Sequence, residues 1–215
     1  LGKELWTDGG EGELISVYAG FNEQDEARFI VERIEEWVKD GHDRSSSAIL
    51  YRSNAQSRVL EEAMIRGGIP YRIYGGQRFY DRLEIKNALA YMRLTNNRDD
   101  DTATERVINT PTRGIGSKTI EVIRAYAREH NQSLWRAAVN IIDNKLLPNR
   151  ASSALQGFIE MIDVMDKNTD DVTLEELADH VVNASGLIEF HKKEKGEKGQ
   201  ARIENLQELV DAARQ

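Results

Sequence analysis

The sequence predicts a fold in two parts, a partial parallel α/β layer followed by an all-α unit, and a mostly helical chain overall. Strand and helix patterns alternate as far as about residue 94. A polar, turn-rich run, "TNNRDDD" (95–101), then forms a candidate boundary, and beyond it only helical spacing of apolar residues continues. With 215 residues, 40% of them apolar, the chain can form one or two domains with a core.

The first part contains three strand patterns, each followed by a helical pattern. The expected strands are 14–20, 47–52 and 70–76. The expected helices are 22–40, 56–68 and 83–94. Asn22 suits the N-cap of the first helix, and two glycines stop the second. Repeated strand–helix alternation is typical of a parallel sheet.

The second part is a series of helical patterns separated by polar turns. They cover about 102–109, 117–130, 133–144, 150–166, 173–185 and 201–214. Thr102 with Glu105, and Thr173 with Glu176, have the spacing of capping boxes. The charged run "HKKEKGEKGQAR" (191–202) is interpreted as a solvated loop, with a weak phosphate contact as the alternative.

The charge distribution limits the kinds of partner. The net charge of −8 argues against a uniformly basic nucleic-acid binder, but residues 52–94 hold eight Arg or Lys against four acids. Residues 106–128 carry five basic residues, Arg106, Arg113, Lys118, Arg124 and Arg128, against Glu121 alone. Such stretches can place a polyanion locally, although ordinary scatter of surface charge gives similar counts.

The composition also excludes several chemistries. No cysteine is present, so disulfides and thiolate metal sites are excluded, and a cytoplasmic setting fits. No apolar run is long enough to span a membrane, and the first ten residues lack a signal-peptide pattern. There is no Walker A loop, the four histidines lack metal-ligand spacing, and no carboxylate pair suits acid–base catalysis. We therefore expect no catalytic residues and no metal ligands in this chain.

The stretch "TPTRGIGSKTIEVIR" (110–124) predicts a tight turn between two helices. Pro111 ends the first helix, the two glycines permit an unusual backbone, and Ile115 can enter the core. The free amides at the start of the next helix, near the Ser117 and Thr119 hydroxyls, can then hold a phosphate without reading a base. A simple packing turn is the alternative. The candidate DNA-binding residues are Thr112, Arg113, Gly114, Ile115, Gly116, Ser117, Lys118 and Thr119.

The stretch "YGGQRFYDRLEIK" (74–86) is a second candidate. Arg78, Arg82 and Lys86 are four residues apart, so on a helix they would share a face. Basic side chains interleaved with aromatic ones suit single-stranded DNA. The alternative is a core role for Phe79 and pairing of Arg82 with a nearby acid.

Three long segments carry a family resemblance. They are "AILYRSNAQSRVLEEAMIRGGIPYRIYGGQRFYDRLEIKNALAYMRL" (48–94), "INTPTRGIGSKTI" (108–120) and "EKGEKGQARIENLQELV" (194–210). Together they resemble the UvrD/Rep/PcrA group of superfamily 1 DNA helicases, over essentially the whole chain.

The resemblance implies a fragment of an ATP-dependent 3′–5′ DNA helicase of DNA repair. Residues 1–96 would be part of the second RecA-like motor domain, and 97–215 the first portion of a helical subdomain inserted into it. The Gly-Ile-Gly turn would be a helix-hairpin-helix-like contact to duplex DNA, and residues near Arg78 and Lys86 would approach the single strand.

The implied partners are DNA, at a duplex and single-strand junction, and repair proteins, with no membrane. ATP and Mg²⁺ would be used by the full-length helicase but not by this fragment, which lacks the Walker motifs and is expected to be inactive alone. A helical module for autoregulation or partner binding, with little DNA binding of its own, is the alternative function.

Overall fold

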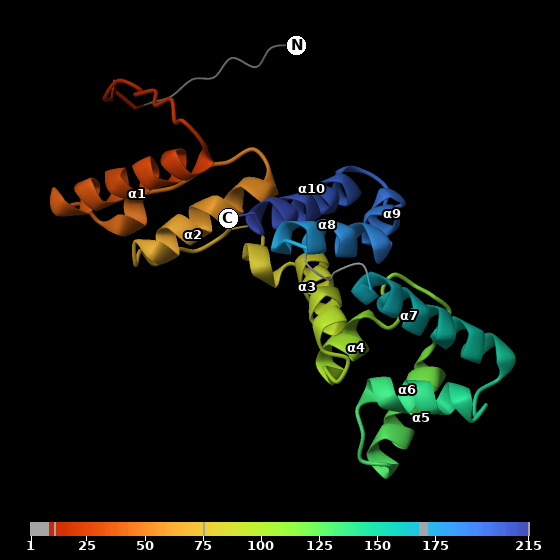
Figure 1. Cartoon of the computed structure of the whole chain (residues 1–215). Coiled ribbons are helices and arrows are strands. Elements are labelled where there is room, and N and C mark those ends of the chain that lie inside the picture. The colour runs from red at the N-terminus through yellow and green to blue at the C-terminus, as the bar shows by residue number, and fades with distance from the viewer. Residues whose placement is uncertain (1–8, 11, 75, 168–171, 215) are drawn as a thin grey trace. The chain divides into compact units, whose positions relative to one another are not determined.

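The computed structural model describes residues 9–10, 12–74, 76–167 and 172–214 (Figure 1). The chain divides into two compact units. The first unit comprises residues 1–49 and 62–70, and the second comprises 50–61 and 71–215. All the regular secondary structure assigned within the described residues is helical, which confirms the expectation of a mostly helical chain.

The first unit is organised by α1 (Glu23–Lys39), with the short helix η1 (Arg44–Ser46) after it. Asn22 is the N-cap, as predicted, because its side chain accepts a hydrogen bond of 2.8 Å from the Asp25 amide. Asp25 in turn accepts a 2.8 Å hydrogen bond from the Tyr18 hydroxyl, and the Tyr18 ring stacks on Phe29. These contacts join the chain before α1 to the first turns of the helix.

The three predicted strands, 14–20, 47–52 and 70–76, are wrong for the described residues, which form no strand there; Gly75 lies outside the described part. A strand needs the amides and carbonyls of a neighbouring strand, and none of these segments pairs with another described segment. Leu14, Ile15 and Val17 are more than nine-tenths exposed. Alternating apolar residues therefore mark segments that suit a sheet, but do not form one without a partner.

The second unit begins with η2 (Asn54–Gln56) and the first residues of α2 (Ser57–Arg66), and then contains η3 (Phe79–Asp81). The longer helices follow in order: α3 (Leu83–Asn96), α4 (Asp101–Val107), α5 (Ser117–Glu129), α6 (Leu134–Asp143), α7 (Asn149–Lys167), α8 (Leu174–Ala184), α9 (Leu187–Lys192) and α10 (Glu197–Ala212).

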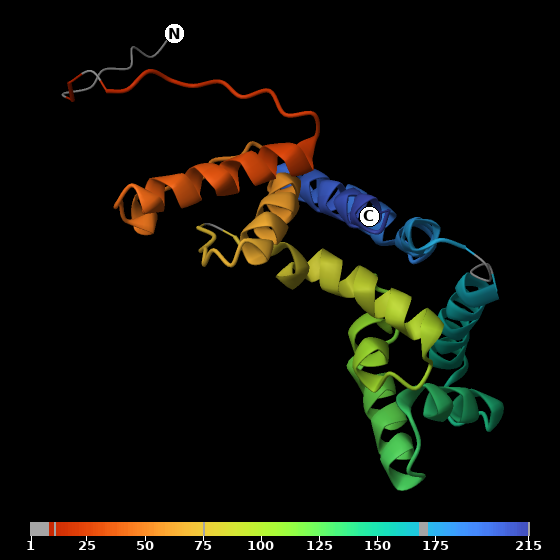
Figure 2. The same cartoon turned by 60° about the vertical axis from the view of Figure 1, so that its left-hand side comes forward.

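The core of the second unit is built around α3. Its side chains Ile85, Ala88, Tyr91 and Leu94 are fully buried, and α3 packs against α4, α7, α8 and α10. Helix α5 packs on α6, and α10 lies alongside α8 and α9 (Figures 1 and 2). The segment 97–100 between α3 and α4 is tied down by Arg98, whose guanidinium donates to the Thr95 carbonyl at 2.8 Å and pairs with Asp166 on α7.

Of the two predicted capping boxes, one needs correction. The N-cap of α4 is Asp100 and not Thr102, because the Asp100 side chain accepts from the Ala103 amide at 2.8 Å. The Thr173–Glu176 capping box is confirmed.

The run 191–202 is not a loop, because α9 ends and α10 begins within it. Its two glycines form the connection between these helices. Gly196 has φ +78°, and a Cβ on Gly199 would collide with the His191 carbonyl.

Candidate nucleic-acid interface

The turn between α4 and α5 is held by side chains on its inner side. The Asn109 side-chain oxygen accepts from the Arg113 amide at 2.7 Å and from the Ile115 amide at 3.3 Å. The Tyr91 hydroxyl donates to the Thr110 carbonyl at 2.6 Å, and Ile115 is fully buried. The turn is therefore a fixed part of the core, as the position of Ile115 predicted.

The two glycines of this turn serve different purposes. Gly114 has φ +81°, a conformation that favours glycine. Gly116 is the N-cap of α5 with φ −79° and ψ 171°, which any residue can adopt, and a Cβ there would meet nothing within 4 Å. The backbone needs glycine at Gly114 only, so the absence of a side chain at Gly116 leaves open space in front of α5.

That space borders the exposed start of α5. The first helical hydrogen bonds run from the Thr119 and Ile120 amides to the Gly116 carbonyl, so the Ser117 and Lys118 amides precede the helical ladder. Gly116, Ser117 and Lys118 are exposed, and so is Thr112. Thr119, by contrast, is buried, with 8% of its surface exposed. The arrangement offers two backbone amides and one ammonium group to an anion.

Arg113 is not part of this exposed surface. Its guanidinium donates to the Pro111 carbonyl at 2.9 Å and to the Ser185 carbonyl, at the end of α8, at 2.7 Å. It also lies over the rings of Tyr91 and Phe158, at 5.6 and 5.8 Å from their centroids. Burial raises the pKa of Tyr91 to about 12, although the neighbouring Arg113 charge acts in the opposite direction.

The second predicted cluster is not brought together on one helix face. Arg78 precedes η3 and Arg82 is the extended N-cap of α3, with ψ near 142°, so only Lys86 lies inside a long helix. Arg78 is exposed beside the ring of Tyr71, and Lys86 pairs with Asp81 at 2.9 Å. The hydrogen bond and charge of Lys86 lower the pKa of Asp81. The spacing of four residues failed as an indicator because the chain is not one continuous helix here.

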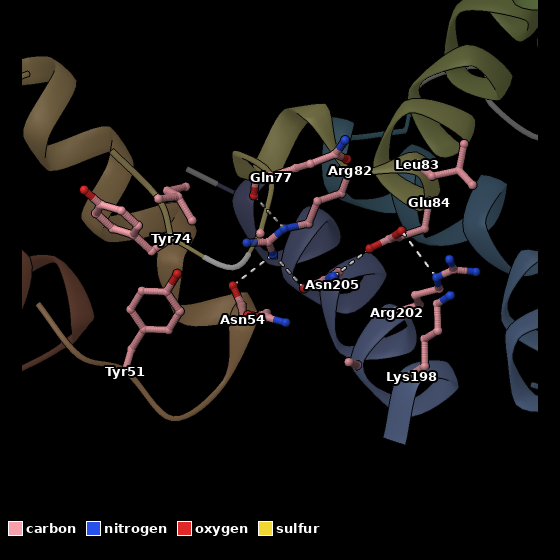
Figure 3. A pocket seen from close by; sticks show the side chains of 13 residues that line it. Tyr51, Asn54, Tyr74, Gln77, Arg82, Leu83, Glu84, Lys198, Arg202 and Asn205 are labelled. Atoms are coloured by element: carbon pink, nitrogen blue, oxygen red, sulfur yellow. Dashed lines mark hydrogen bonds and ion pairs between the residues drawn. The ribbon is translucent and has the colours of Figure 1, made fainter. Parts of the chain in front are cut away.

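Arg82 is buried, with 8% of its surface exposed, and burial lowers its pKa. Figure 3 shows its guanidinium directed at Asn54 and Asn205. It donates to the Asn54 carbonyl at 2.9 Å, the Asn205 side-chain oxygen at 2.8 Å and the Ser57 hydroxyl at 2.6 Å. Neither Asp81 nor Glu84 is its hydrogen-bond partner, although the charges of Glu61 and Glu84 favour the charged guanidinium.

A cavity of about 260 Å³ lies beside Arg82, in the second unit (Figure 3). Its wall includes Tyr51 and Tyr74 on one side, and Lys198 and Arg202 of α10 on the other. Asn205 donates to Glu84 at 2.7 Å, and Arg202 pairs with Glu194 at 2.6 Å. Sequence reasoning missed Asn205 and the α10 side of this cavity, since nothing local to α10 marks Asn205 as a partner of Arg82.

The described residues show no other site chemistry. Among them, no group of three His, Cys, Asp or Glu side chains could hold a metal ion. His42 stacks on Trp37 and His130 on Tyr126, while His191 is buried beside Glu194. No helix in the described ranges has the length and apolar character to cross a membrane.

Comparison with known proteins points in the same direction as the sequence motifs. A family model described as UvrD-like helicase C-terminal domain matches residues 2–215. DNA helicase II of Escherichia coli K12 is 56% identical over the whole chain, and that of Haemophilus influenzae 53%. The ATP-dependent DNA helicase PcrA of Bacillus subtilis is 38% identical over 99% of the chain. The chain spans about 30% of the length of these relatives.

Proposed function

Because the chain belongs to the UvrD-like helicase C-terminal domain family, we propose that it is part of an ATP-dependent 3′–5′ DNA helicase acting in DNA repair in the cytoplasm. In this proposal residues 1–96 are part of the second RecA-like motor domain, and 97–215 are the first portion of an inserted helical subdomain. Repair proteins would be further partners of the complete helicase.

The contribution of this chain is a phosphate contact to duplex DNA, made by a helix-hairpin-helix-like turn. The observation that carries it is the exposed start of α5, where Gly116 leaves open space before the Ser117 and Lys118 amides. Backbone amides at a helix start bind phosphate oxygens without distinguishing bases, which suits an enzyme that moves along any sequence. Ile115 and Gly114 support the contact from within, and Thr112 lies exposed at its edge.

Single-stranded DNA is proposed to pass the surface near Arg78 and Lys86. Arg78 is exposed beside an aromatic ring, a combination that serves both phosphate and base stacking. Arg82 would support this surface from below through its bonds to Asn54 and Ser57.

In this proposal ATP and Mg²⁺ are bound by the full-length helicase and not by this chain. The sequence has no Gly-x-x-x-x-Gly-Lys-Ser/Thr loop to cradle phosphates. The described residues also provide no carboxylate cluster for a metal ion. The role proposed for this chain is therefore to hold DNA.

The test is a salt titration of binding between the 215-residue chain and a fluorescent duplex with a single-stranded tail. We expect salt-sensitive affinity near the non-specific range of about 10⁻⁴ to 10⁻⁶ M. Gly116→Ala adds a methyl group in the open space and should weaken binding about tenfold, the loss of one hydrogen bond to a charged group. Gly157→Ala is the matched control, because Gly157 is exposed on α7 and also has open space.

Circular dichroism of each variant separates folding from binding. Unchanged duplex binding by a folded Gly116→Ala chain would remove the contact from this turn. No binding by a folded wild-type chain at low salt would instead favour the autoregulatory or partner-binding module.

A further inference from the structure

Arg113 is the basic residue closest to the turn, yet its guanidinium is engaged with protein groups. One terminal nitrogen donates to the Val107 carbonyl at 3.3 Å and the Pro111 carbonyl at 2.9 Å. The other donates to the Ser185 carbonyl at 2.7 Å and contacts the Met161 sulfur at 3.6 Å. Both terminal nitrogens of the guanidinium are thus used twice, and a phosphate could bind them only by replacing protein partners.

The Ser185 carbonyl is a favourable partner for a cation. Ser185 is the C-cap of α8, where unpaired carbonyls carry partial negative charge. The next residue, Gly186, has φ +78° and is the N-cap of α9. A Cβ on Gly186 would lie 3.9 Å from the Pro111 ring, so the α8–α9 junction and the turn are in close proximity at a second point.

We propose that Arg113 is a positioning residue for the duplex contact: it holds the Gly-Ile-Gly turn against the α8–α9 junction and does not bind phosphate itself. This inference rests on the proposed function of the turn. The Arg113 guanidinium joins three segments, namely the end of α4, the turn at Pro111 and the end of α8. The direction in which the Ser117 and Lys118 amides point then depends on an arginine that lies behind them.

An arginine and a lysine differ in this role. The planar guanidinium can donate to several carbonyls in fixed directions, whereas an ammonium is a compact point charge. A residue that only attracts phosphate tolerates exchange between the two. A residue that bridges Pro111 and Ser185 through two different nitrogens does not.

The experiment compares Arg113→Lys and Arg113→Gln with Lys118→Arg and Lys118→Gln, using duplex binding over a range of salt. We expect Arg113→Lys and Arg113→Gln each to lose about tenfold in affinity for the duplex. The salt slope of both variants should equal that of wild type. Lys118→Arg should bind like wild type, and Lys118→Gln should lower the salt slope by about 0.9, the value for one phosphate contact. Arg66→Lys, at the exposed end of α2, is the control substitution.

Amide hydrogen exchange supplies a readout that does not depend on DNA. The Arg113 and Ile115 amides, which bond to Asn109, and the Leu187 amide, which bonds to Ser185, should exchange about tenfold faster in Arg113→Lys. They should be unchanged in Lys118→Gln. If wild type fails to bind the duplex, the proposed function fails, while the exchange rates still decide whether Arg113 positions the turn.

The proposal is overturned if Arg113→Lys binds like wild type while Arg113→Gln loses affinity and about 0.9 of salt slope. It is equally overturned if exchange at the turn is unaffected in Arg113→Lys. Should both Arg113 variants fail to fold, NMR of the wild-type guanidinium decides the question. Resonances unmoved by the duplex support positioning, and resonances shifted by the duplex, with loss of the Ser185 contact, refute it.

Discussion

Replacing Arg82 by alanine should destabilise the second unit. The guanidinium donates to the Asn54 carbonyl, the Asn205 side chain and the Ser57 hydroxyl. All three lose a donor in Arg82→Ala, and the substituted side chain leaves a gap next to the existing cavity. Glu61 and Glu84, whose charges favour the charged guanidinium, remain with one cation fewer nearby.

The magnitude follows from these contacts. A buried polar group left without its partner costs about 1–3 kcal/mol, and water entering from the cavity reduces the sum for the three acceptors. Removing one member of a buried charged network costs about 3–5 kcal/mol. We therefore expect Arg82→Ala to lower the free energy of unfolding by about 3–5 kcal/mol. Arg78→Ala, which removes an exposed arginine beside Tyr71, should cost at most about 1 kcal/mol.

Urea unfolding followed by tryptophan fluorescence measures the difference. Trp135 is buried in the second unit, so replacing Trp6 and Trp37 by phenylalanine makes the signal specific to that unit. The midpoint and slope give the free energy of each variant. The reasoning would be refuted if Arg82→Ala unfolded at the same urea concentration as wild type but lost affinity for single-stranded DNA.

Two further predictions concern the turn. In the folded chain the pKa of Tyr91 is about 12, above the ordinary value of about 10. The contribution of Tyr91 to the free energy of unfolding is therefore fully present below pH 10 and is lost as the pH rises through 12. Tyr91→Phe should therefore lose less stability than wild type across that alkaline range, measured by urea midpoints, and an identical alkaline loss in both would contradict the assignment. Gly114→Ala should cost about 1 kcal/mol because of its φ of +81°, whereas Gly116→Ala should be neutral or stabilise by up to about 1 kcal/mol. Equal changes in their urea midpoints would show that the two glycines do not differ in this way.

Local patterns were sufficient for most of the helices. The predicted segments 117–130 and 133–144 became α5 (Ser117–Glu129) and α6 (Leu134–Asp143) because apolar spacing and N-caps act within a few residues. The capping box at Thr173 was equally local. The strand predicted at 14–20 was wrong because a strand, unlike a helix, is completed only by hydrogen bonds from another segment.

The turn between α4 and α5 was also largely predictable from its local sequence. Its glycines, its buried isoleucine and the helix that follows could be inferred from "TPTRGIGSKTIEVIR", because backbone conformation and burial of one apolar residue depend on near neighbours. The family resemblance could be read from the motifs as well, and the matching family model confirms it.

The direction of the arginine side chains was decided by tertiary structure. In sequence, Arg113, Arg82 and Lys118 are equivalent as basic residues beside candidate motifs. In the fold, Arg113 reaches a carbonyl 72 residues away, Arg82 reaches an asparagine 123 residues away, and Lys118 is exposed. A long cationic side chain binds whichever acceptors folding brings within its reach, and those acceptors come from distant helices. Only Lys118 of the three therefore presents its charge to solvent at the start of α5.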